Sequence, residues 1–159
     1  MNDLGNRRLL KLAAFLRTVP RKHFNLDVIA NNSNDIDDGK TNCQIIKRMK
    51  EIGKTNKKYD CGAAACAIGW MPAAFPRQCK WSSNKDTWYS EINVVLRSSN
   101  KKDFAAAKEF FDICEKQADY LFQPDFYPNS RYNSISPKTV AKRIEKFVKT
   151  NGQMVYDKV

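Results

Sequence analysis

The sequence predicts a mainly α, compact single-domain helical fold with a small β-hairpin around residues 78–96. Apolar residues recur at helical spacing near both ends of the chain, while β-prone residues gather in that one central segment. A length of 159 residues supports one well-formed core and is short for two. A polar and basic stretch at about 31–58 is predicted to be an insertion in this single domain, which spans residues 1–159.

The first helix is predicted over residues 6–18. Leu9, Leu12 and Leu16 recur at helical spacing and form an apolar stripe, while most basic residues of the segment lie outside it. Pro20 follows and ends the helix, because proline lacks the amide proton that a helix interior needs.

Residues 31–39 predict a polar loop, and a second helix is predicted from 43 to 52. The loop is not an EF-hand, since placing Gly39 at the glycine position puts isoleucines at calcium-ligand positions. This helix and the loop after it carry the densest basic cluster of the chain. The cluster comprises Lys47, Arg48, Lys50, Lys54, Lys57 and Lys58.

The segment from Cys61 to Trp70 consists largely of small residues and predicts a tightly buried helix. A cysteine at a helix N-terminus can act as a thiolate nucleophile, and residues 60–64 resemble the nucleophile segment of bacteriocin-processing papain-like peptidases. Those enzymes need a histidine downstream of the cysteine, whereas His23, the only histidine, lies upstream. A structural role is therefore the prediction, with His23 in a half-exposed loop, and a Cys61–His23 hydrolase is the weaker alternative.

After the hairpin, helices are predicted over residues 103–113 and 115–122, the second ending before Pro124. The last helix begins with Ser136 as its N-cap and Pro137 in its first turn. Its outer face is predicted to be basic. The residues assigned to that face are Lys138, Lys142, Arg143, Lys146 and Lys149.

Composition points to an anionic partner. The net charge of +11 favours nucleic acid, a nucleotide or an acidic protein surface. No apolar run approaches the roughly 20 residues of a membrane span. Five cysteines without a CxxC pair predict reduced thiols in the cytoplasm and no metal site, and no motif implies a cofactor.

Several segments together resemble an uncharacterised group of small proteins encoded mainly by bacteriophages and some bacteria. The matching segments are residues 9–16, Val19-Pro20, Phe24, 61–70, 110–113, 118–124, Tyr127 and 140–147. The resemblance covers about two thirds of the chain. It implies a phage accessory protein acting in host takeover or anti-defence, in the cytoplasm of an infected bacterium, and it carries no catalytic residues to transfer.

The leading hypothesis is a non-catalytic protein that binds nucleic acid or a signalling nucleotide through its two basic clusters. For a nucleotide, aromatic side chains would stack on the base beside Arg77 or Lys80. The stacking candidates are Trp81, Trp88, Tyr89, Tyr127 and Tyr132. The alternative is an inhibitor or modulator that docks its basic face on a host enzyme. The sequence leaves the oligomeric state open.

Overall fold

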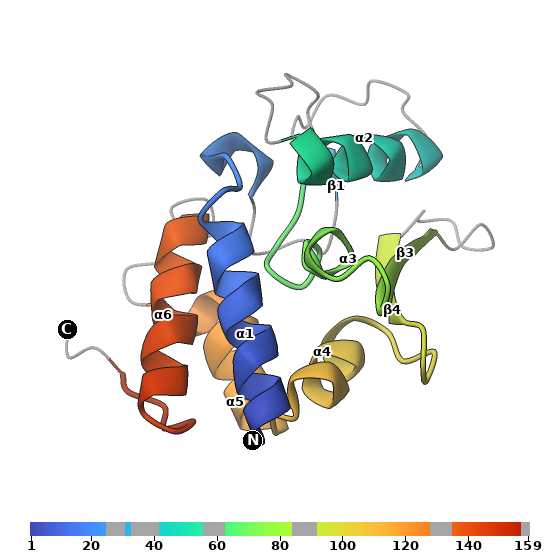
Figure 1. Ribbon diagram of the computed structural model, residues 1–159. Coiled ribbons are helices and arrows are strands. Elements are labelled where there is room, and N and C mark those ends of the chain that lie inside the picture. Colours follow the sequence, from blue (N-terminus) through green and yellow to red (C-terminus); the bar gives the residue numbers. More distant parts are fainter. Residues whose placement is uncertain (25–30, 33–41, 56–62, 84–91, 128–134, 157–159) are drawn as a thin grey trace.

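Two helices from opposite ends of the chain, α1 and α6, lie side by side in the computed structural model (Figure 1). The structure describes residues 1–24, 31–32, 42–55, 63–83, 92–127 and 135–156. The α-helices are α1 (Asp3–Leu16), α2 (Asn42–Thr55), α3 (Met71–Ala74), α4 (Asp103–Phe111), α5 (Glu115–Phe122) and α6 (Pro137–Lys149). The other elements are η1 (Arg21–His23), β1 (Asn31–Asn32), β2 (Ala63–Ala64), β3 (Cys79–Ser83), β4 (Ile92–Leu96) and η2 (Pro124–Phe126). The predicted mainly α fold is confirmed.

The core forms where the apolar stripe of α1 meets α6. Leu9, Leu12 and Leu16 are fully buried, as are Val140 and Ile144 of α6. In the last helix, Ser136 Oγ accepts a hydrogen bond from the Thr139 amide at 3.0 Å, which confirms the predicted N-cap. The first helix begins three residues earlier than predicted, because the side chain of Asn2 caps it by accepting from the Gly5 amide at 2.8 Å.

The predicted hairpin is confirmed as an antiparallel pair, in which Cys79 of β3 lies opposite Leu96 of β4. The predicted helices at 103–113 and 115–122 are α4 and α5, which pack against the hairpin and α6 respectively. Among the residues that the structure places, no helix is long and apolar enough to cross a membrane.

The stretch predicted as an insertion contributes to the core. Its helix is α2, and Ile45 and Met49 are buried where α2 packs against α3 and β2. The predicted polar loop is wrong at its first two residues, since β1 pairs antiparallel with β2. Residues 33–41 lie outside the described part of the chain.

The helix predicted over residues 61–70 is wrong from Ala63 onward, where the described residues begin, although its burial is confirmed from Ala65 to Trp70. The His23 carbonyl accepts hydrogen bonds from the Ala65 amide at 3.2 Å and from Trp70 Nε1 at 3.1 Å. Residues 63–65 bond their backbone groups to β1 and to the His23 carbonyl, whereas a helix would bond these groups internally. These tertiary contacts therefore override the helix propensity of alanine. Regular helix begins only at α3.

Of the four cysteines in the described part of the chain, two are buried and two are exposed, which gives a labelling prediction. Burial raises the pKa of Cys66 to about 12, against the opposing hydrogen bond from the Gly69 amide, and raises that of Cys79 to about 11. Cys43 and Cys114 are exposed. At about pH 8, iodoacetamide should therefore label Cys43 and Cys114 in the native protein and spare the buried pair, because only an accessible thiolate reacts.

Peptide mapping by mass spectrometry resolves each cysteine separately. The unfolded protein serves as the control, in which all four of these cysteines should react. Equal labelling of Cys66 and Cys114 in the native protein would contradict the buried position of Cys66.

Candidate anion-binding surfaces

Four exposed lysines follow one face of α6, opposite its buried stripe. They are Lys138, Lys142, Lys146 and Lys149, and we call this set the lysine ridge. Their spacing of four, four and three residues places them on one side of the helix, over a length of about 16 Å. Glu145 is the only acidic residue of α6, and its carboxylate pairs with Arg17, the C-cap residue of α1, at 2.9 and 2.7 Å. Four lysines therefore stand against one acidic side chain on this helix.

Arg143 does not belong to this face, so its predicted position is wrong. It is only 8% exposed, and its Nη1 donates to the carbonyls of Tyr120 at 2.9 Å and Phe126 at 2.7 Å. Its guanidinium carbon lies 3.5 Å from the centre of the Tyr127 ring. These carbonyls belong to the last turn of α5 and to η2, where helix ends leave acceptors without intrahelical partners. Arg143 satisfies them and is structural.

The structure describes only part of the basic cluster on α2 and the loop after it. Lys47 and Lys50 are exposed and Arg48 is half-buried, which agrees with a basic outer face on this helix. The side chains of Lys54, Lys57 and Lys58 lie outside the described part.

The described aromatic candidates are not open to a base. Trp81 is half-buried, and its Nε1 donates to the Gly69 carbonyl at 2.8 Å, which holds the indole against the core. Tyr127 is buried and donates its hydroxyl to the Leu121 carbonyl at 2.6 Å, and burial raises its pKa. The remaining candidates, Trp88, Tyr89 and Tyr132, lie outside the described residues.

His23 differs from the prediction, because it is 1% exposed and not half-exposed. Its backbone carbonyl accepts from the Ala65 amide and the next residue, Phe24, bridges with Ala65, so this segment lies against the core. Cys61, its suggested partner, lies outside the described residues. Within the described ranges, no three His, Cys, Asp or Glu side chains gather as a metal site would require.

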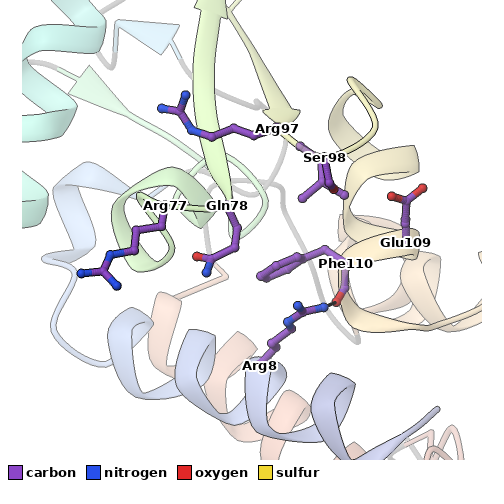
Figure 2. A pocket seen from close by; sticks show the side chains of 8 residues that line it. Arg8, Arg77, Gln78, Arg97, Ser98, Glu109 and Phe110 are labelled. Atoms are coloured by element: carbon purple, nitrogen blue, oxygen red, sulfur yellow. Dashed lines mark hydrogen bonds between the residues drawn. The ribbon is translucent and has the colours of Figure 1, made fainter.

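A cleft of about 420 Å³ opens between α1, α4 and the open end of the β3–β4 hairpin, and sequence reasoning did not find it (Figure 2). Its polar lining is rich in arginine, and Leu96 and Phe110 supply its apolar part. The lining residues are Arg8, Arg77, Gln78, Leu96, Arg97, Ser98, Glu109 and Phe110. Of these only Arg77 had been considered as a ligand contact, because no local pattern joins residues so far apart in the chain.

Comparison of the chain with protein-family models, curated proteins and solved structures gives no match. The fold and its surfaces define a mainly α protein with a basic ridge and an arginine-rich cleft. The resemblance to the phage-encoded group stays a prediction.

Proposed function

We propose that this protein is a non-catalytic phage-type accessory protein that binds nucleic acid through the lysine ridge, with the exposed lysines of α2 as a second contact. The observation that supports this is the concentration of four exposed lysines on one face of a helix held firmly to the core. Its setting would be host takeover or anti-defence in the cytoplasm of an infected bacterium.

Repulsion between the lysines of the ridge destabilises α6, and an anionic partner would remove this repulsion. Like charges four residues apart destabilise a helix by about 0.2–0.5 kcal/mol for each pair. Lys138, Lys142 and Lys146 form two such pairs in succession. One strand of B-DNA carries a phosphate about every 3.4 Å along the axis, so a ridge of about 16 Å spans about five phosphates. A polyanion fits this row better than a compact ligand does.

The protein should bind DNA or RNA with an affinity that falls steeply as salt rises. Four neutralised phosphates predict a loss of about 100-fold between about 50 and 200 mM salt on duplex DNA. Fluorescence anisotropy with short labelled duplex DNA, single-stranded DNA and RNA measures this slope. The variant K138Q/K142Q/K149Q should lower the slope by about 2–3 on duplex DNA, because each lysine contributes about 0.9.

The matched control is K80Q/K102Q/K116Q, which removes the same charge from exposed lysines outside the ridge. It should leave most of the slope intact. Binding that does not respond to salt, or equal losses in the two triple variants, would exclude the ridge as the contact surface.

The alternative partner is an acidic surface on a host enzyme. Pull-down from host lysate, with and without nuclease, separates the two partners. A partner protein retained after nuclease and lost in the ridge variant would replace nucleic acid with a protein target.

A further inference from the structure

We propose that the arginine-rich cleft is a second, separate site that binds the phosphate group of a small phosphomonoester, such as a nucleoside monophosphate. Its three arginines come from α1, from the turn before β3 and from the turn after β4. None of them belongs to the lysine ridge, so this site does not depend on the nucleic-acid proposal.

Arg8 is pre-positioned at the base of the cleft. Its Nη1 donates to the Phe110 carbonyl at 2.7 Å, and its guanidinium carbon lies 4.1 Å from the centre of the Phe110 ring (Figure 2). That carbonyl lies in the last turn of α4, where a helix lacks internal donors. A guanidinium has five N–H donors, and among the described residues Arg8 makes no other hydrogen bond. The rest of its donor fork is therefore available to a ligand.

Arg77 and Arg97 supply positive charge at the rim. Both are exposed, and their segments are tied together because the Arg97 amide donates to the Gln78 carbonyl at 2.8 Å. Within the described part of the chain, neither forms an ion pair. Figure 2 shows both guanidinium groups pointing away from Glu109 and from the space between Gln78, Ser98 and Phe110. Both side chains are exposed, so an anion seated at Arg8 would draw them in by a change of side-chain rotamer.

The acidic residue in the lining does not cancel this charge. Lys101 Nζ lies 2.8 Å from the Glu109 carboxylate, and hydrogen bonds from Lys101 and Ser99 lower the pKa of Glu109. Its negative charge is therefore matched by a lysine outside the cleft, and the three arginines remain in excess. Burial raises the pKa of the neighbouring Cys79, while Arg8 and Arg97 oppose that rise, so their positive potentials overlap at this end of β3.

The side chains that line the cleft are suited to bind a phosphate dianion. Arginine forks bind phosphate oxygens in pairs, and hydrogen bonds between two charged groups are about twice as strong as neutral ones. Gln78 and Ser98 add neutral donors to the lining, and Leu96 and Phe110 add apolar surface. The volume lies in the range of small-molecule sites, so a nucleoside monophosphate fits in size.

Isothermal titration calorimetry of the full chain with three probes tests the site. Inorganic phosphate and adenosine monophosphate should both bind, while adenosine should not, because it lacks the group that the arginines recognise. Tighter binding of the nucleotide than of phosphate would identify an organic phosphate as the ligand, and equal binding would identify free phosphate. Failure of both phosphate probes to bind at millimolar concentration would overturn the proposal.

Variants then locate the binding. R77Q and R97Q change exposed side chains and should each weaken phosphate binding by about 10-fold. The matched control is K116Q, an exposed cation on α5 outside the cleft, which should bind as the wild type does. Equal losses in K116Q and R97Q would place the anion elsewhere. The ridge variant K138Q/K142Q/K149Q should retain phosphate binding, which separates this proposal from the nucleic-acid proposal.

Discussion

Replacing Arg143 with glutamine should lower the free energy of unfolding by about 3 kcal/mol, because a buried acceptor without a partner costs about 1–3 kcal/mol. The guanidinium donates to two carbonyls, those of Tyr120 and Phe126, and also lies against the Tyr127 ring. Glutamine is too short to replace both hydrogen bonds and the ring contact together. Urea unfolding followed by circular dichroism measures the loss.

The adjacent residue provides a matched control. Lys142→Gln removes the same charge from the neighbouring position but changes an exposed side chain, so it should alter stability by less than about 0.5 kcal/mol. Arg143→Lys should recover only part of the loss, because an ammonium group lacks the planar fork that bridges the two carbonyls. Equal stability of the Arg143→Gln and Lys142→Gln proteins would mean that Arg143 is an ordinary surface cation.

Gly5→Ala should destabilise the protein by about 1 kcal/mol net, because overpacking a close contact costs about 2 kcal/mol and alanine returns about 1 kcal/mol of helix propensity. A Cβ atom at Gly5 would overlap the backbone carbonyl oxygen of Phe111, so α1 and α4 would have to move apart. This steric cost exceeds the gain of about 1 kcal/mol that alanine normally brings to a helix. Differential scanning calorimetry should show a lower Tm.

The opposite substitution on the same helix isolates the packing effect. Ala14 is exposed on α1, and Ala14→Gly should cost about 1 kcal/mol through propensity alone. Alanine is thus expected to be the better residue at position 14 and the worse one at position 5. A Gly5→Ala protein that melts above the wild type would show that α1 and α4 do not approach so closely.

Sequence reasoning succeeded where structure depends on nearby residues. The stripe of α1 and the cap of α6 are set by spacing within a few turns, so these helices were predictable. The segment from Ala63 to Trp70 was not predictable in the same way. Its conformation depends on strand pairing with Asn31–Asn32 and on the carbonyl of His23, and both lie far away in the chain.

The candidate sites also divide into those set by nearby residues and those set by contacts between distant segments. The exposed lysines of α6 follow from helical periodicity, so the sequence predicted their shared face. Arg143 directly follows Lys142 in the sequence, and the basic pattern alone does not distinguish an outward arginine from one that reaches back to carbonyls on η2 and α5. The cleft was missed because the segments that carry Arg8, Arg77 and Arg97 line one cleft only after the hairpin and two helices have packed.

The pairing of α1 with α6 also affects how this chain can fold during its synthesis. The Arg17–Glu145 contact joins residues 128 positions apart, and the two helices share the centre of the core. Ribosomes add about 5–20 residues per second, so α6 is synthesised several seconds after the apolar stripe of α1. Throughout that interval Leu9, Leu12 and Leu16 have no α6 to cover them. The nascent protein is therefore a natural client for chaperones that shield apolar segments until the last helix arrives.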